Sequence, residues 1–264
     1  MSVVITGFEP TTTRSHDVSG FSHIKLRGIG TLEIHQGDRE GVEVDAPANL
    51  HDHIQVRVDA DTLTVGLHDT TLHIHGSGTM ELRFRVYVRS LTGIESSGAG
   101  KVIADRITAD RLGIRCSGAA KIQLHTMEVP DLAVELNGAG KLLCDTLRSG
   151  TIHMALKGAG KVDVASLTTD GIRVSISGAG KITASGTANS QDISISGAGL
   201  IDFSGVRGQT ARISLSGAGK ALVNVSGSLD AHVSGTGKIA YAGNPHDVRQ
   251  STSGFGKVVS SSKS

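Results

Sequence analysis

Apolar and polar residues alternate over most of the chain, in short runs that end at glycine-rich bends. In one such run Ile172, Val174 and Ile176 are apolar, and the residues between them are Arg173 and Ser175. A period of two is typical of a β-strand with one buried face. It argues against a helical repeat, because helical apolar residues recur every three or four positions and two glycines interrupt each unit here.

A glycine-rich marker recurs from residue 98 onward. Its form is Gly-x-Gly-Lys, most often Gly-Ala-Gly-Lys, and successive copies start 18 to 20 residues apart. A unit this short cannot bury its own apolar face, whereas stacked units can. We therefore expect a parallel β-helix of about 20 residues per coil, right-handed like most parallel crossovers. The nine markers begin at Gly98, Gly118, Gly138, Gly158, Gly178, Gly197, Gly217, Gly235 and Gly254.

The marker predicts a sharp corner in every coil. Its glycines are expected to turn the chain through positive φ and to let neighbouring corners stack closely. Alanine fits between the glycines, and a bulky residue there would crowd the column of corners. In the last marker Phe255 replaces this alanine, and we expect its ring to cover exposed core at the end of the rod.

The chain before the first marker is also rich in strand patterns. It is expected to form a β-rich cap, because an open β-helix end exposes strand edges and apolar core. The predicted division is a flexible leader over 1–17, the cap over 18–97, the β-helix over 98–258 and a disordered tail over 259–264. Seven cap strands are predicted at Phe21–Arg27, Thr31–His35, Val42–Asp45, Ile54–Val58, Leu63–Leu67, Thr71–His75 and Glu81–Val88.

Composition narrows the possible functions. The 26 Lys and Arg residues nearly balance the 25 Asp and Glu residues, which argues against a globally basic nucleic-acid binder. No run of 18 apolar residues exists, so no transmembrane helix is expected. The first ten residues lack a basic segment followed by an apolar run, so no secretion signal is recognised. Cys116 and Cys144 are expected to be buried free thiols.

No cofactor or metal is assigned. The marker lacks the Gly-x-x-x-x-Gly-Lys-Ser/Thr spacing of a phosphate-binding loop, so no nucleotide is expected. No aspartate column accompanies the glycines, which argues against calcium. His73 and His75 share one face of a predicted strand and could bind a metal, but they lack an acid or cysteine at ligand spacing, so surface histidines are the alternative.

Catalytic chemistry is also left unassigned. Polysaccharide-cleaving β-helices need carboxylates clustered on one outer face. Here Asp105 and Asp145 share a column two coils apart with His125 between them, and Asp163 and Asp202 form a second such pair. The sequence favours scattered, solvated acids and a protein that is not an enzyme.

The most regular chemical feature is a column of lysines, one per coil. If Val102 faces the core, each marker lysine faces out. Two interpretations remain open: solubility with protection of strand edges, or a linear track for an anionic polymer such as a cell-surface polysaccharide. The candidate ligand-binding residues are Lys101, Lys121, Lys141, Lys161, Lys181, Lys220 and Lys238, with Lys257 at the end and Leu200 as a gap.

Ordered motifs over Val18 to about Val258 resemble those of the auto-transporter adhesin, head GIN domain family. This resemblance implies a bacterial β-solenoid with an adhesive role at the periplasm or cell surface, and it supplies no catalytic residues. Because the chain shows no secretion signal, a cytoplasmic location stays open. The motifs are Val18–Ile24, Thr31–Asp38, Leu63–Val65, Phe84–Val88, Ser97–Gly100, Tyr241–Pro245 and Ser253–Gly256.

The sequence therefore predicts a non-enzymatic β-helix of the cell envelope that binds an anionic polymer through its lysine column. Two alternatives remain. The first is a self-assembling scaffold that stacks through rod ends or faces, which would make the protein a homo-oligomer. The second is a polysaccharide-degrading β-helix enzyme.

Overall fold

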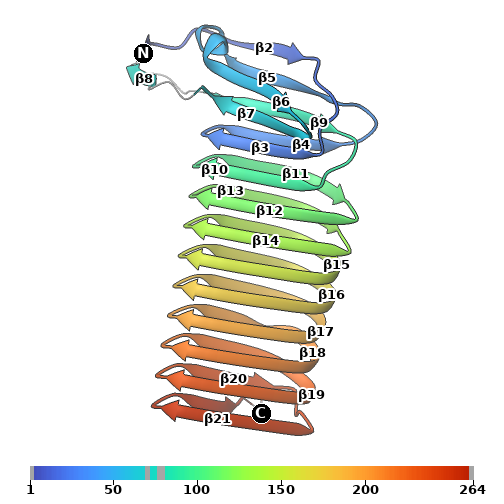
Figure 1. Ribbon diagram of the computed structural model, residues 1–264, viewed down its shortest axis with the longest axis vertical. Helices are drawn as coiled ribbons and strands as arrows, with labels where there is room; N and C mark the ends of the chain where they lie inside the picture. Colours follow the sequence, from blue (N-terminus) through green and yellow to red (C-terminus); the bar gives the residue numbers. More distant parts are fainter. Residues whose placement is uncertain (1–2, 69–71, 76–80, 262–264) are drawn as a thin grey trace.

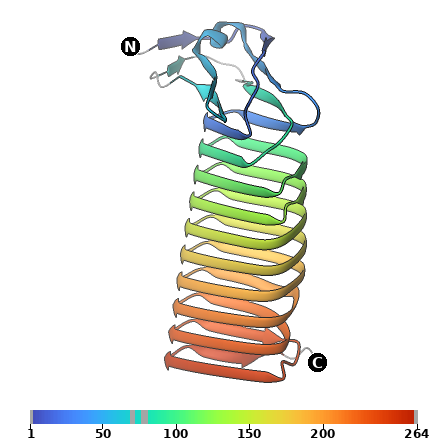
Figure 2. The same ribbon diagram turned by 45° about the vertical axis from the view of Figure 1, so that its right-hand side comes forward.

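The computed structural model is an elongated rod of stacked coils (Figures 1 and 2). It describes residues 3–68, 72–75 and 81–261, with the backbone alone for 3–6 and 72–75. The chain is a nearly all-β parallel solenoid, with about 8 turns of roughly 20 residues each. The predicted fold class is thus confirmed. The described part of the chain contains no helix of the length and hydrophobicity needed to cross a lipid bilayer.

Each coil consists of two straight strand segments joined by a corner and a bend. We call the segments that follow each marker the first sheet, and the segments that precede each marker the second sheet. The repeat strands are β10 (Gly93–Gly98), β11 (Lys101–Thr108), β12 (Arg111–Gly118), β13 (Lys121–Glu128), β14 (Asp131–Gly138), β15 (Lys141–Gly158), β16 (Lys161–Gly178), β17 (Lys181–Gly197), β18 (Leu200–Gly217), β19 (Lys220–Gly235), β20 (Lys238–Ala242), β21 (Asp247–Gly254) and β22 (Lys257–Ser260).

The core lies between the two sheets, as the alternation predicts. In β16, Val162 and Val164 from the first sheet and Ile172 and Val174 from the second are buried. The bend residue Leu167 is buried too, as a third inward contact. Because the strands pair in register, each apolar column continues from coil to coil.

The marker forms a sharp corner whose stacking explains its glycines. At Gly158 φ is 116°, and a Cβ atom would lie 2.7 Å from the carbonyl oxygen of Gly138 in the preceding corner. The corners are tied together by hydrogen bonds from Ala159 N to Gly138 O and from Lys161 N to Gly140 O, both 2.9 Å. The predicted positive φ and close stacking are both present.

Phe255 corrects one expectation. Its side chain is 87% exposed and does not cover the core. The middle position of a marker points to solvent, as exposed Ala159 and Ala179 show. Side-chain size is therefore not restricted there, and the crowding expected of a bulky residue does not occur.

The N-terminal region stacks on the rod in an order that differs from the order of the chain. Its elements are β1 (Val3–Thr6), β2 (Thr11–His16), β3 (His23–Gly28), β4 (Thr31–Gln36), β5 (Gly41–Pro47), the 3₁₀ helix η1 (Ala48–His53), β6 (Ile54–Asp59), β7 (Thr62–Leu67), β8 (Leu72–His75) and β9 (Arg83–Val88). Strands β3 and β4 lie between β7 and β9 on one side and β10 and β11 on the other. After β4 the chain forms the outer rung with β7 and β9, and it then passes β3 and β4 to continue the stack at β10 (Figure 1).

Two predicted boundaries differ from this arrangement. Gly28 pairs in register with Gly98, so the stack extends to strands that precede the first marker. Residues 11–16, expected to be part of a flexible leader, form β2, which pairs antiparallel with β5. The reason is the run of threonines at 11–13, since threonine favours extended backbone and β5 offers an edge.

The C-terminal end of the rod has no covering element among the described residues. Every residue of β21 is exposed, and β22 continues to Ser260, within the predicted tail. Ser261 N still donates to Tyr241 O at 2.7 Å. The remainder of that predicted tail, 262–264, lies outside the described residues.

Both thiols are buried and free. Burial, together with the nearby Asp145 carboxylate, raises the pKa of Cys144 to about 12. Because only the thiolate reacts readily, we expect native Cys144 to resist iodoacetamide at neutral and mildly alkaline pH. Mass spectrometry should find it alkylated after unfolding in denaturant. Equal labelling of the native and unfolded protein would contradict this burial.

Candidate functional site

The strand register lines up the marker lysines on the outer face of the first sheet. Lys101 pairs with Lys121, and the column continues coil by coil to Lys181. Leu200 then interrupts it, and it resumes with Lys220, Lys238 and Lys257. Val102 is buried, so the lysines face solvent as expected. We call this row the lysine column.

The charges of the lysine column are mostly uncompensated. Lys161 Nζ lies 3.0 Å from an oxygen of Asp163. Among the residues that the structure describes, no acidic side chain pairs with the other lysines of the column. Neighbouring ammonium groups about 5 Å apart in water repel each other by roughly 0.8 kcal/mol. An anionic ligand would relieve that repulsion.

The column beside the lysines varies in charge along the rod. Next to Lys101, Lys121 and Lys141 stand the uncharged, half-buried Ile103, Gln123 and Leu143. In later coils the same column contains the carboxylates of Asp163 and Asp202. This column therefore places no carboxylate beside the first three lysines, nor beside Lys220 and Lys238.

A histidine separates the first pair of aspartates. His125 lies between Asp105 and Asp145, with Nδ1 2.6 Å from Asp145 Oδ2 and Nε2 3.9 Å from Asp105 Oδ1. The imidazole occupies the space that a substrate and a water would need between two catalytic carboxylates. All three side chains are exposed.

The second pair is separated as well. Thr183 lies between Asp163 and Asp202 in the column. Asp163 is bound by Lys161, and Asp202 accepts a 2.6 Å hydrogen bond from Ser204 Oγ. Among the described residues no group of three or more His, Cys, Asp or Glu side chains could hold a metal ion. The side chains of His73 and His75, expected as possible metal ligands, lie outside the described part.

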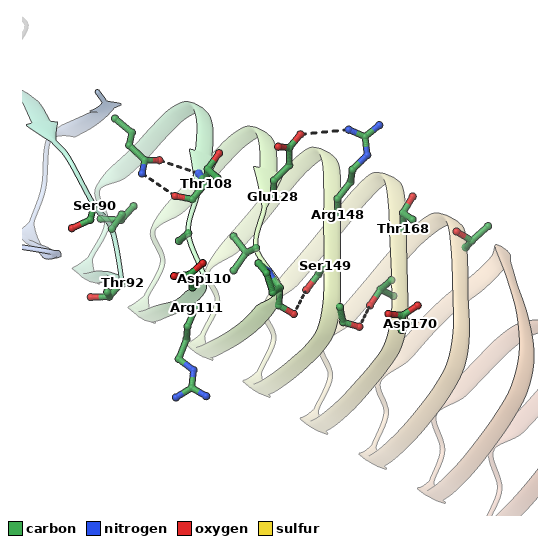
Figure 3. Close-up of a pocket in the computed structure, with 18 of the residues that line it drawn as sticks. Ser90, Thr92, Thr108, Asp110, Arg111, Glu128, Arg148, Ser149, Thr168 and Asp170 are labelled. Carbon is green, nitrogen blue, oxygen red and sulfur yellow. Dashed lines mark hydrogen bonds and ion pairs between the residues drawn. The ribbon is translucent and has the colours of Figure 1, made fainter. Parts of the chain in front are cut away.

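The structure adds a groove that the sequence does not reveal. It has a volume of about 1180 Å³ and follows the bends of successive coils, from Thr108 to Asn189 (Figure 3). Ser149 and Thr169 lie along it, and their hydroxyl groups donate hydrogen bonds to backbone carbonyls. Ser149 Oγ donates to Pro130 O at 3.3 Å, and Thr169 Oγ1 donates to Gly150 O at 3.0 Å.

Polar side chains close the groove at its N-terminal end and line its rim. Gln36 binds the backbone of Thr108 twice, through Nε2 to the carbonyl at 2.8 Å and through Oε1 to the amide at 2.9 Å. On the rim, Glu128 pairs with Arg106 at 3.2 Å. It also pairs with Arg148 at 3.5 Å (Figure 3). The charges on this rim are internally paired, whereas the exposed carboxylates of Asp110 and Asp170 in the groove have no ion-pair partner among the described residues.

The fold and these surfaces define the class of protein. It is a capped, two-sheet parallel β-helix that presents repeated side-chain columns along its length. The sequence matches the family described as "Putative auto-transporter adhesin, head GIN domain" over residues 20–145 and 133–245. The chain belongs to this family, which confirms the predicted resemblance.

Solved structures show the same fold. A putative adhesin from Parabacteroides merdae is 24% identical, with a TM-score of 0.74, and the match covers 98% of this chain and 99% of that one. A putative adhesin from Parabacteroides distasonis is 23% identical, with a TM-score of 0.74 and coverage of 98% and 100%. A putative lipid binding protein from the same species is 20% identical, with a TM-score of 0.73 and coverage of 98% and 100%. None of the curated proteins compared matches this chain.

Proposed function

We propose that this chain is a non-enzymatic adhesion module at the cell surface or envelope, and that its lysine column binds an anionic polysaccharide. The supporting observation is the in-register row of lysines, of which only Lys161 has an acidic partner among the described residues. Membership of an adhesin family supports the surface role. The separated and individually paired aspartates favour binding over cleavage.

The first three coils are the preferred binding stretch. Lys101, Lys121 and Lys141 place one ammonium group per coil, about 4.8 Å apart. The exposed parts of Ile103 and Leu143 beside them give an apolar surface for the carbon faces of sugar rings. A flexible, linear polyanion can follow such a row and release bound counterions as it does so.

The test is retention on immobilised polygalacturonate, with neutral dextran as the comparison matrix. The wild type should bind polygalacturonate, elute as salt is raised, and pass through dextran. Changing Lys101, Lys121 and Lys141 together to Gln should weaken binding about tenfold, since each exposed ion pair contributes roughly 0.5 kcal/mol.

The matched control carries the same loss of charge elsewhere on the rod, as Arg111→Gln, Arg115→Gln and Arg148→Gln. These side chains lie outside the lysine column. Retention should stay near wild type if the column is the site. If both triple variants weaken binding equally, the loss of net charge alone explains the effect and the proposal is refuted.

A further inference from the structure

The outer face of the second sheet has a charge pattern with no part in the proposed polysaccharide binding. Over β16 to β21 one column alternates in sign, with one charged side chain per coil. The column is Arg173, Asp192, Arg212, Asp230 and Arg249. We call it the alternating column.

Short hydroxyl side chains flank the alternating column. On one side stand Ser175, Ser194 and Ser214, followed by His232, and beyond them Ser177, Ser196, Ser216 and Ser234. On the other side stand Gly171, Ser190, Thr210 and Ser228. The serines between 175 and 216 are exposed. The face is therefore a flat field of small polar groups with a single charged ridge.

We infer that this face is a self-association surface, and that its partner is a second copy of the chain lying antiparallel. The two copies are related by a two-fold axis that lies in the plane of the face, runs perpendicular to the rod and passes between the coils of Asp192 and Arg212. This axis places each column of one copy against the same column of the other copy, with the order of the coils reversed. Asp192 then meets Arg212 of the second copy, and Arg173 meets Asp230. By symmetry these become four intermolecular ion pairs.

The flanking columns fit the same arrangement. Ser194 meets Ser214, Ser196 meets Ser216, and Ser190 meets Thr210, so the side chains next to the axis are short. The larger His232 lies one coil further out, opposite the short Ser175. A parallel arrangement instead brings each charge against its own copy, for example Arg212 against Arg212, which is repulsive. The alternation of sign thus selects the antiparallel dimer.

The available charge and area are sufficient for a specific contact. Within one chain Arg173 Nε lies 3.0 Å from Asp192, and Arg212 Nε lies 3.6 Å from Asp230. Both arginines remain more than half exposed, with 66% and 75% of the side-chain surface accessible, so each has donors left for a partner. The overlap covers six coils, from His153 to Arg249, with Arg249 of one copy opposite His153 of the other. Six coils at about 4.8 Å and strands of about 23 Å give roughly 1,300 Å² over both copies, above the lower bound for a specific interface. The lysine columns stay on the outer faces of such a dimer.

The test is a charge swap measured by sedimentation velocity over a concentration series. The wild type should dimerise reversibly. Arg212→Asp places two like-charged pairs in the interface and should raise the dimer Kd about 100-fold. Asp192→Arg should do the same. An equimolar mixture of the two variants should restore wild-type association, because each aspartate at 212 then meets an arginine at 192.

A double variant separates the interface from the pairs within each chain. Asp192→Arg with Arg212→Asp breaks both intrachain pairs but keeps all four intermolecular ones in the proposed register. It should dimerise like the wild type, and circular dichroism should show an unchanged fold. A wild type that stays monomeric at its highest soluble concentration would overturn the inference. So would a mixture that fails to associate, or a double variant that remains monomeric.

Discussion

Replacing Gly158 by alanine should lower the stability of the rod by roughly 3 kcal/mol, because a strained backbone and a steric clash act together. The φ of 116° belongs to a region that residues with a Cβ rarely occupy. The new methyl carbon would lie 2.7 Å from Gly138 O, an atom fixed by its hydrogen bond from Ala159 N. Thermal unfolding followed by circular dichroism should show a fall in Tm of roughly 8 °C.

The neighbouring residue supplies the control. Ala159 is exposed, so Ala159→Ser should change the stability by less than about 0.5 kcal/mol. Similar losses for both variants would mean that the corner as a whole is sensitive, and that the positive φ of Gly158 is not the cause. The contrast matters because both residues belong to the same Gly-Ala-Gly-Lys marker.

Local rules were sufficient for the repeats. Alternation such as Ile172, Val174 and Ile176 fixes which side chains face the core, and the regular marker fixes the register, since a one-residue slip would turn every apolar side chain outward. The lysine column follows directly from that register. The ion pair at Lys161 does as well, because Asp163 lies two residues further along the same strand face.

The N-terminal stacking order could not be deduced in this way. Strands β7 and β9 come later in the chain than β3 and β4 but lie further out on the stack, and no local pattern specifies which rung is formed by which segment. One signal was present: Gly28 and Gly30 form a marker in which Thr31 replaces the lysine. Its pairing with Gly98 shows that the glycines define the corner and that the lysine is not needed for it.

The two surfaces that the sequence left unrecognised differ in kind. The groove arises from the backbone path of successive bends, so no residue pattern encodes its concavity. The alternating column was encoded, since Arg173, Asp192, Arg212 and Asp230 each stand five residues before a marker glycine. The sign of its charge changes from one coil to the next and so repeats every two coils. This period becomes visible only when the repeat units are aligned at their markers.

A second large effect is expected in the core of the rod, where Phe203→Ala should lower the stability by about 3 to 5 kcal/mol. Phe203 is fully buried and pairs with Val223 in the next coil. One coil earlier the buried Ala184 follows Thr183, which pairs with Asp202. A large side chain thus fills space that a small neighbour leaves, and its removal would create a cavity that the stacked backbone cannot close.

The same substitution at Phe255 is the matched control. Its ring is 87% exposed, so Phe255→Ala should leave the unfolding midpoint unchanged within error, when both variants are compared in one urea titration. A large loss for Phe255→Ala would restore the idea that this ring covers the end of the rod. A small loss for Phe203→Ala would mean that the coils relax around the cavity. We expect the two variants to differ in stability. The burial of each ring, and not its place in the repeat, determines how much stability is lost when the ring is removed.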